Sequence, residues 1–281
     1  MNNPIEQRFY DELIGELERG ALVLPTLPEV ALRVRHVVDR EDSSVSDIAD
    51  IVNTDPALSA RLIQVANSPL MRGVIHIDSV QVAIMRMGQK MVRDIVTGLV
   101  MQQMFQATSE ATDTRLHAIW QHSTLVAAIS HYLAQQHTAV PPDQAMLAGL
   151  IHDIGALPIL TRAEEVPELL DDERLLDQVI RSLHCRIGER ILTTWHFPHE
   201  MIAVAAGHES HQRRHDGPPD LLDIVIVANL QSYAGTDHPL AEVDWGTVPA
   251  FARLGLDTEI GVIDMDESAE QIKEVQKTLM S

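Results

Sequence analysis

The chain of 281 residues predicts an all-α fold, on three observations. Apolar residues recur at helical spacing in almost every segment. Helix-start signals precede several of these runs, such as Asp55-Pro56, where aspartate can cap free N–H groups and proline suits the first helical position. Aromatic residues make up only 4% of the chain. The core therefore has to be built from Leu, Ile, Val, Ala and Met, a mixture that favours helices packed on helices.

The first half of the sequence divides into four predicted helices. Ser79 is expected to start the third of them and Gly88 to end it. Asn-Ser-Pro at 67–69 ends the second helix. The four helices cover 30–38, 56–66, 79–88 and 91–105. Three methionines are expected to fill gaps in the core, namely Met85, Met87 and Met91.

The second half begins after a polar stretch of small residues at 106–113, the best candidate for a domain boundary. A charged loop rich in Gly and Pro, at 212–220, interrupts the helical pattern once more. At the end of the chain, Ile272, Val275 and Leu279 lie along one face, which predicts a helix that docks on the rest of the fold. One predicted helix of the second half follows Pro141-Pro142 and reaches Asp153. The others cover 120–137, 174–195, 200–209, 221–233 and 268–280.

The composition argues against several classes of protein. A net charge of −20 does not suit nucleic acid, since phosphate binding needs Lys and Arg, and it does not suit an anionic membrane surface. No window approaches the roughly 18 apolar residues of a membrane span, and the N-terminus does not resemble a signal peptide. The single cysteine, Cys185, excludes an internal disulfide and is expected to be a small buried side chain. We therefore expect a cytoplasmic protein.

The most informative feature is the pair His152-Asp153, which lies inside the apolar run 147–155. Burying an imidazole and a carboxylate without partners costs several kcal/mol. Either a hydrogen-bond network or a metal ion has to satisfy them.

Three further histidines are candidates for the same site. His184 precedes Gly188 by one helical turn, and the glycine permits a close approach of another backbone. His208 ends a run of small residues and is followed by Glu209. His122 alone is more typical of a satisfied core histidine. Together they favour a metal, because imidazoles and a carboxylate from facing helices build divalent sites in bundles, and neutral His suits Fe, Mn, Zn or Ni.

The motifs resemble a known family. In the second half they are Trp120-Gln121-His122-Ser123, the 149–155 run, His184-Cys185-Arg186-Ile187-Gly188 and His208-Glu209, and their order resembles the HD superfamily of metal-dependent phosphohydrolases. In the first half they are Leu24-Pro25-Thr26-Leu27-Pro28, Asp55-Pro56-Ala57-Leu58, Val65-Ala66-Asn67-Ser68-Pro69 and the segment 79–88. These motifs are similar to the HDOD family, the branch of the superfamily regarded as a bacterial signalling output domain.

The resemblance covers about 24–256 and implies an HD-like helical core with an additional N-terminal helical bundle. It divides the chain into an N-terminal helical extension at 1–23, an N-terminal lobe at 24–107, the HD-like core at 108–260 and a C-terminal helix at 261–281. It also implies a set of metal ligands, namely His122, His152, Asp153, His184 and His208. In an active enzyme, Asp153 and His152 would be catalytic, and Arg213 and Arg214 would be candidates for phosphate contact.

Three positions depart from the pattern of active enzymes. By the resemblance, Gly207 replaces a further histidine, Asn229 replaces a closing aspartate, and Ala156 replaces a lysine. The implied ligands then supply one carboxylate, that of Asp153. Two divalent ions would bring four positive charges, and a low-dielectric pocket penalises such an imbalance of charge. The sequence thus favours one divalent transition metal (Fe, Mn, Zn or Ni) over a two-metal site.

Two functions stay open at this point. One is a non-catalytic or weakly catalytic signal-transduction module with a remnant HD metal site, whose partner is another signalling protein. The other is a metal-dependent phosphohydrolase that acts on a nucleotide or cyclic dinucleotide. The sequence does not fix the oligomeric state.

Overall fold

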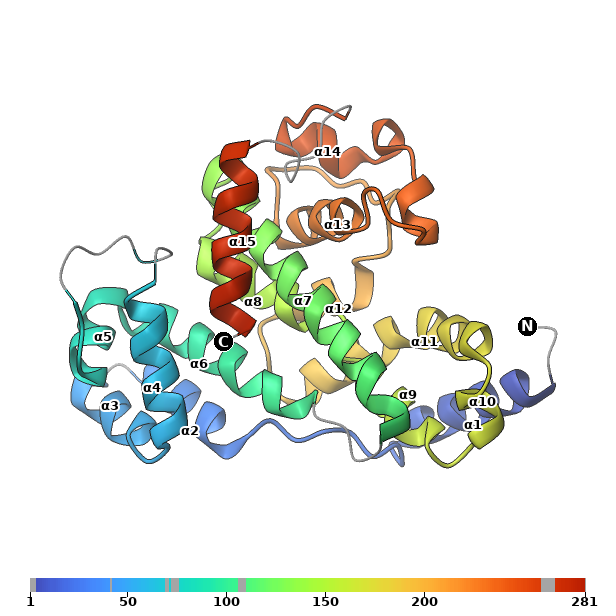
Figure 1. Ribbon diagram of the computed structural model, residues 1–281, viewed down its shortest axis with the longest axis horizontal. Helices are drawn as coiled ribbons and strands as arrows, with labels where there is room; N and C mark the ends of the chain where they lie inside the picture. The colour runs from blue at the N-terminus through green and yellow to red at the C-terminus, as the bar shows by residue number, and fades with distance from the viewer. Residues whose placement is uncertain are drawn as a thin grey trace.

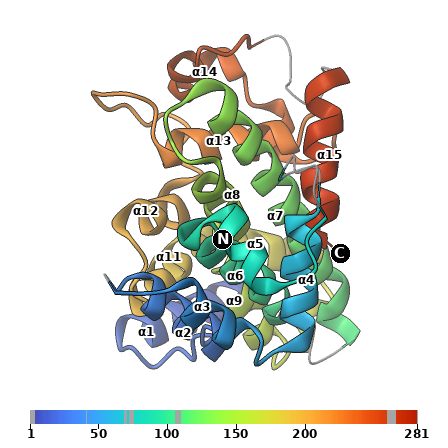
Figure 2. The ribbon, with the colours of Figure 1, turned by 90° about the vertical axis from the view of Figure 1, so that its left-hand side faces the viewer.

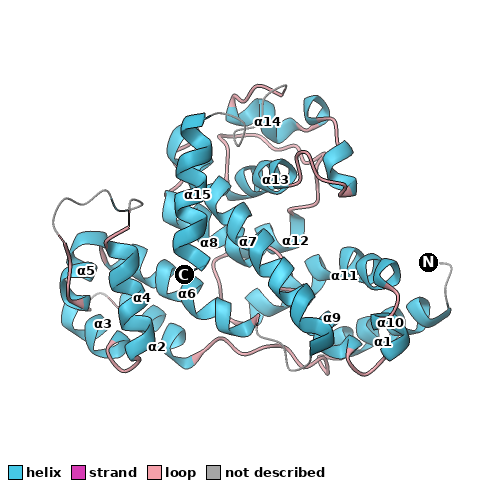
Figure 3. Ribbon diagram, viewed as in Figure 1, coloured by secondary structure: helices cyan, strands magenta, loops and turns pink. Residues whose placement is uncertain are grey.

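The computed structural model describes residues 4–40, 42–68, 71, 76–105, 110–258 and 266–280. All regular elements in these ranges are helices and none is a strand (Figure 3). The prediction of an all-α fold is confirmed.

The N-terminal lobe consists of four short helices and a longer one. They are α2 (Glu29–Val38), α3 (Val45–Val52), α4 (Pro56–Ala66), α5 (Val80–Met87) and α6 (Gln89–Met104). The predicted helix starts are confirmed, because Asp55 accepts hydrogen bonds from the N–H groups of Ala57 and Leu58, and Ser79 accepts one from Val82. The apolar faces of these helices meet in a dry core that includes Val34 and Leu62.

Met85 and Val82 of α5 do not belong to this core. Met85 is 64% exposed and Val82 is 40% exposed, three residues apart on the same helix. The expectation that Met85 fills a gap in the core is therefore wrong, whereas Met87 and Met91 pack against the core as expected. α5 turns one face to the core, where Ala83 is buried, and Met85 lies on the opposite face of the helix.

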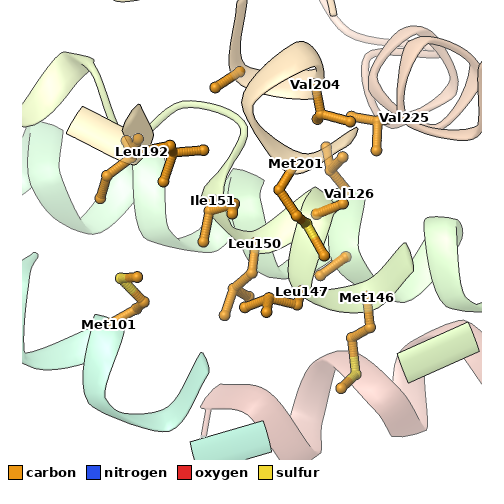
Figure 4. Close-up of a cluster of buried hydrophobic side chains, with 14 of the residues drawn as sticks. Met101, Val126, Met146, Leu147, Leu150, Ile151, Leu192, Met201, Val204 and Val225 are labelled. Atoms are coloured by element: carbon orange, nitrogen blue, oxygen red, sulfur yellow. The ribbon is translucent and has the colours of Figure 1, made fainter. Parts of the chain in front are cut away.

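The core lobe is built around α8. Its helices are α7 (Glu110–His137), α8 (Pro142–Ile151), α9 (Ala156–Ala163), α10 (Pro167–Leu170), α11 (Glu173–Thr194), α12 (His199–Gly207), α13 (Leu221–Ser232) and α14 (Pro249–Leu254), with 3-10 turns η2 (Pro239–Glu242) and η3 (Trp245–Thr247). Figure 4 shows Leu147, Leu150 and Ile151 of α8 among side chains of other helices, namely Met101, Val126, Leu192, Met201, Val204 and Val225. Residues 145–151 are all buried, so α8 is the central helix of the lobe.

One expectation about membranes needs correction here. Pro142–Ala163 has the length and the hydropathy of a membrane span, although no window was expected to approach one. Its apolar window is 83% buried inside the fold, and a turn at His152 and Asp153 separates its two helices. The apolar character of this segment is thus explained by its place at the centre of the core lobe.

α7 is longer than predicted. It begins at Glu110, ten residues before the expected start at 120, so part of the polar stretch at 106–113 is helical. Residues 106–109, and with them the predicted boundary between 107 and 108, lie outside the described residues, as does the boundary between 260 and 261.

Both ends of the chain pack on the core lobe. α1 (Pro4–Glu18) lies beside α10 and α11, at the far end from α2–α5, and the segment between α1 and α2 crosses the molecule (Figure 1). α15 (Asp266–Met280) lies along α7 in both ribbon views (Figures 1 and 2). Ile272, Val275 and Leu279 are buried there, which confirms the predicted docking helix.

Arg35 of α2 connects the two lobes. Its guanidinium donates hydrogen bonds to the carbonyls of Trp195 (3.2 Å) and His196 (3.0 Å) and lies 4.1 Å from the ring centre of Phe197. In the opposite direction, the indole N–H of Trp195 donates to the carbonyl of Pro25 at 3.0 Å. These contacts hold the N-terminal lobe against the corner between α11 and α12.

Gly155 allows the turn after α8 to touch the backbone of α11. A Cβ atom at this position would lie 1.9 Å from the carbonyl oxygen of His184 and 2.5 Å from the nitrogen of Gly188. No side chain fits in that space, so the glycine sets the distance between Asp153 and His184. The close approach expected at Gly188 is confirmed, since its own Cβ would lie 3.6 Å from the nitrogen of Gly155.

We expect Gly155→Ala to lower the free energy of unfolding by about 3 kcal/mol or more, at the upper end of overpacking, because backbone atoms block the added methyl group. Gly15→Ala is the matched control. Inside α1 its methyl group meets only the flexible end of Arg19, so a gain of about 0.5–1 kcal/mol in helix propensity should dominate. Urea denaturation measures both, and equal effects of the two substitutions would contradict this account.

Candidate metal centre

The five predicted ligands converge in the core lobe, and we call them the His–Asp cluster. His122 comes from α7, His152 and Asp153 from the turn after α8, His184 from α11, and His208 from the end of α12. Three of the four histidines are buried, and the side chain of Asp153 is 18% exposed. The structure thus brings together residues that lie up to 86 positions apart, from His122 to His208.

The histidines form two pairs on either side of the Asp153 carboxylate. The Nε2 atoms of His122 and His152 are 3.2 Å apart, and those of His184 and His208 are 3.1 Å apart. Oδ2 of Asp153 lies 3.2 Å from His152 and 3.6 Å from His122. Oδ1 lies 3.2 Å from His208 and 3.5 Å from His184. Each carboxylate oxygen therefore faces one pair of imidazoles.

Backbone carbonyls orient three of the rings. The Nδ1 atoms of His152, His184 and His208 lie 2.7, 2.8 and 3.1 Å from carbonyl oxygens three or four residues earlier in the chain. A carbonyl oxygen only accepts, so each Nδ1 has to carry a proton and donate it. Each neutral ring then presents the lone pair of Nε2 to the centre of the cluster, which is the arrangement of metal-binding histidines.

A side-chain network orients the fourth ring. The hydroxyl of Ser232 donates to the carbonyl of Asn229 at 2.7 Å, so its oxygen is free to accept from Nδ1 of His122 at 3.5 Å. The ring of Tyr233 stacks on His122 with 4.7 Å between the centroids, and its hydroxyl lies 3.3 Å from Nε2. His122 thus also presents Nε2 toward Asp153.

His122 differs from His184 and His208 in its affinity for protons. Burial lowers the pKa of His122 to about 3, so this ring is neutral. Burial also opposes protonation of His184, but the Cys185 thiol and Asp153 outweigh it and raise its pKa to about 9. Hydrogen bonds to Asp153 and Cys185 likewise raise the pKa of His208 well above its usual value, against its burial.

The carboxylate at the centre keeps its charge. Burial favours the neutral form of Asp153, but its close contacts with the imidazoles of His152, His208 and His184 hold its pKa well below the usual range. An ionised carboxylate and four Nε2 atoms are the oxygen and nitrogen donors that divalent transition metals take.

The donor set fits a metal ion in a further respect. The side-chain oxygen of Asn229 is buried, lines the pocket beside the cluster and has no hydrogen-bond partner among the described residues. A buried amide oxygen without a partner costs about 1–3 kcal/mol, and a metal ion or its bound water would satisfy it. The resemblance to the family leads one to expect an aspartate at this position. The amide of Asn229 still offers an oxygen there, but without a charge.

A pocket of about 500 Å³ opens beside the cluster. Tyr233 and His238 form one wall, with their rings stacked at 3.8 Å between centroids. Arg115 and Arg181 also line it, and Arg115 is held by Asp177 at 2.6 Å. The sequence reasoning missed these residues, because the turn that carries His238 reaches the cluster only through the fold.

Arg213 belongs to a different group of charges. It donates to Asp220 at 2.6 Å and to Asp223 at 2.9 Å, and Asp223 also accepts from Arg253 at 3.1 Å and from His215 at 2.8 Å. This group fastens the loop at 212–220 to α13 and α14. The arginines that line the pocket are Arg115 and Arg181, and neither Arg213 nor its neighbour Arg214 is among the lining residues.

Comparisons with known proteins agree with the fold. A family model described as HDOD domain matches residues 24–211. A crystal structure named "Putative metal-dependent phosphohydrolase", from Shewanella amazonensis SB2B, is 30% identical, with a TM-score of 0.86 over 98% of this chain and 99% of that one. An HDOD domain protein of unknown function from Geobacter sulfurreducens is 22% identical, covers 98% of this chain and 99% of that one, and has a TM-score of 0.68.

Two further relatives are more distant. A "Putative signal transduction protein" from Marinobacter aquaeolei VT8 is 20% identical with a TM-score of 0.61, over 100% of this chain and 67% of that one. An uncharacterized protein of Treponema pallidum is 23% identical over 224 residues, which are 74% of this chain. The chain spans 42% of the length of this curated relative.

We expect Mn²⁺ binding to release protons at neutral pH, because His184 and His208 hold protons that metal coordination displaces. The affinity should therefore rise with pH from neutrality toward pH 9, the pKa of His184, because fewer protons have to be displaced. Isothermal titration calorimetry in buffers of different ionisation enthalpy measures the number of protons released. An affinity that stays constant between neutral pH and the pKa of His184 would contradict the assignment.

Proposed function

Because the chain belongs to the HDOD domain family, we propose that it is a bacterial signal-transduction module that holds a divalent metal ion in the His–Asp cluster and does not hydrolyse phosphoesters efficiently. The observation that carries this proposal is the pairing of the imidazoles. Nε2 atoms 3.1 and 3.2 Å apart, on rings whose Nδ1 atoms donate elsewhere, repel each other unless a proton or a cation lies between them.

The residues of the cluster would hold the ion through Nε2 atoms and the Asp153 carboxylate. When bound, a divalent ion supplies a Lewis acid that can bind an anionic group or lower the pKa of a water molecule. The chain's own contribution is to fix the rings through Nδ1 and to keep Asp153 ionised. Both are properties of a metal site, whether or not it is catalytic.

The charges near the cluster argue against efficient hydrolysis of a phosphoester. Two arginines line the pocket against four acidic side chains, and one of those arginines is already paired. A phosphate substrate would meet repulsion that the bound metal has to overcome. The acidic and basic residues of the lining are Asp153, Asp177, Glu209, Asp237, Arg115 and Arg181.

The number of anionic ligands points in the same direction. Asp153 is the one carboxylate within the cluster, and the nearest other, Glu209, lies 3.8 Å from Nε2 of His184 with a side chain 34% exposed. Asn229 is neutral. A clamp of two divalent ions, which hydrolysis in this type of site uses, would leave most of the positive charge uncompensated.

A second candidate function is a metal-dependent phosphohydrolase that acts on a nucleotide or cyclic dinucleotide. The pocket of about 500 Å³ beside the cluster favours it, because that volume suits a nucleotide-sized ligand. The name of the relative that is 30% identical points the same way. In this case Asp153 and His152 would hold the ion at the reacting phosphate.

The output of the module would pass to another signalling protein in the cytoplasm. A protein partner that docks on α5 would cover the exposed apolar side chains of Met85 and Val82. The net charge of −20 supports a partner other than nucleic acid.

We expect the protein purified without added metal or chelator to contain about one divalent ion per chain, measured by elemental analysis. Asp153→Asn should lower the affinity for the ion by more than about tenfold, because it removes the charge of a proposed direct ligand. Residues that only hydrogen-bond to ligands already contribute about 10- to 100-fold to metal affinity. Asp50→Asn, the same change at an exposed site in the N-terminal lobe, should leave the affinity unchanged.

A hydrolysis screen with nucleotides, cyclic dinucleotides and a generic phosphodiester decides between the two functions. We expect the wild type to turn over none of them faster than Asp153→Asn does. Turnover by the wild type that disappears in Asp153→Asn but persists in Asp50→Asn would refute the signalling module and establish the phosphohydrolase.

A further inference from the structure

Cys185 lies at the His184–His208 side of the cluster. It follows His184 on α11, is partly buried, and is the one cysteine of the chain. Its Sγ atom lies 3.4 Å from Nε2 of His184 and 4.0 Å from Nε2 of His208. The three donor atoms all lie within 4.8 Å of one another.

These distances match the edges of a tetrahedral zinc site. Zn–N bonds of about 2.0–2.1 Å and a Zn–S bond of about 2.3 Å place two nitrogens about 3.3 Å apart, and nitrogen and sulfur about 3.6 Å apart. The observed distances are 3.1 Å between the nitrogens and 3.4 and 4.0 Å between nitrogen and sulfur. Oδ1 of Asp153 lies 3.2 and 3.5 Å from the same two nitrogens, so a carboxylate oxygen is available on this side of the cluster.

We propose that the two halves of the cluster have different chemistry, and that Cys185 is a metal ligand. His184, Cys185, His208 and Oδ1 of Asp153 form a half that selects a thiophilic ion, with Zn²⁺ as the natural occupant. This inference rests on the metal centre proposed above. It adds a ligand outside the His and Asp set, and it names the ion for one half.

The other half has no sulfur donor. His122, His152 and Oδ2 of Asp153 offer nitrogen and oxygen, and the hydroxyl of Tyr233 lies 3.3 Å from Nε2 of His122. Two imidazoles and one carboxylate suit Fe²⁺ or Mn²⁺ as well as Zn²⁺. The first half should therefore bind Zn²⁺ more tightly than the second.

The charge of the cluster also favours a thiolate. A thiol that binds Zn²⁺ loses its proton to solvent and becomes an anionic ligand. Together with Asp153 it brings two negative charges to one divalent ion. Without it, that ion would share a single carboxylate with the other half of the cluster.

A cysteine that only packs beside His184 is the competing account. In that case the sulfur makes only a weak hydrogen bond with Nε2 of His184, at 3.4 Å, and contributes nothing to metal binding. The two accounts differ in whether a metal–sulfur bond forms, which spectroscopy detects directly.

The decisive experiment replaces the metal with Co²⁺ and records the absorption spectrum of the folded full chain. We expect a thiolate-to-cobalt charge-transfer band in the near ultraviolet, and Cys185 is its only possible source because the chain holds no other cysteine. The band should vanish in Cys185→Ser. It should persist in the matched control His122→Asn, which removes a ligand from the other half. The Zn²⁺ affinity of Cys185→Ser should fall at least about tenfold.

A second measurement needs no variant. Bound Zn²⁺ should protect Cys185 of the wild type from alkylation by iodoacetamide, and a chelator should restore the reaction. Cobalt bound without a charge-transfer band, or Zn²⁺ bound without protection of the thiol, would overturn the assignment of Cys185 and leave the His–Asp metal centre intact. Failure to bind any Co²⁺ or Zn²⁺ would overturn the metal centre itself, and this inference with it.

Discussion

The hydrogen bonds from Nδ1 of the histidines are the interaction on which the site depends. Each of three rings donates to a carbonyl one turn earlier in its own chain segment, and His122 uses the hydroxyl of Ser232 instead. These bonds direct four Nε2 atoms at one carboxylate inside a helical core. The protein thereby holds together groups that repel one another, and the fold has to be stable enough to offset that repulsion.

The packing around α8 meets this requirement. Residues 145–151 are buried on all sides, so α8 cannot shift without disturbing several helices. Gly155 brings the following turn against the backbone of α11, which fixes Asp153 relative to His184. Contacts from α1, α15 and the Arg35 junction add support from outside the core lobe. The site is thus positioned by helix ends and turns, whereas the helices themselves supply rigidity.

Much of this could be predicted from the sequence, because the signals are local. Asp55 and Ser79 cap helices by their own chemistry, and the apolar spacing of α15 is visible without the fold. The five residues of the cluster were predicted through the order of their motifs. Cys185 and Tyr233 acquire their places beside the cluster only from contacts between distant segments, and a lone cysteine looks the same in sequence whether or not it faces a metal. Met85 was placed in the core because it is apolar, although the buried residues of α5 lie on the opposite face of that helix.

The neutral side chain of Asn229 limits the negative charge of the cluster. Asn229 keeps an oxygen near the pocket but brings no charge. If Cys185 supplies the second anion, the negative charge lies on the His184–His208 side, and the His122–His152 side is left with its share of one carboxylate. Two divalent ions then differ in affinity, because the attraction between an ion and its ligands grows with their negative charge. One ion would then be held firmly and the other weakly. This arrangement suits a signalling module, whose state depends on what occupies its pocket. It does not suit a hydrolytic clamp, which must hold both ions through each turnover.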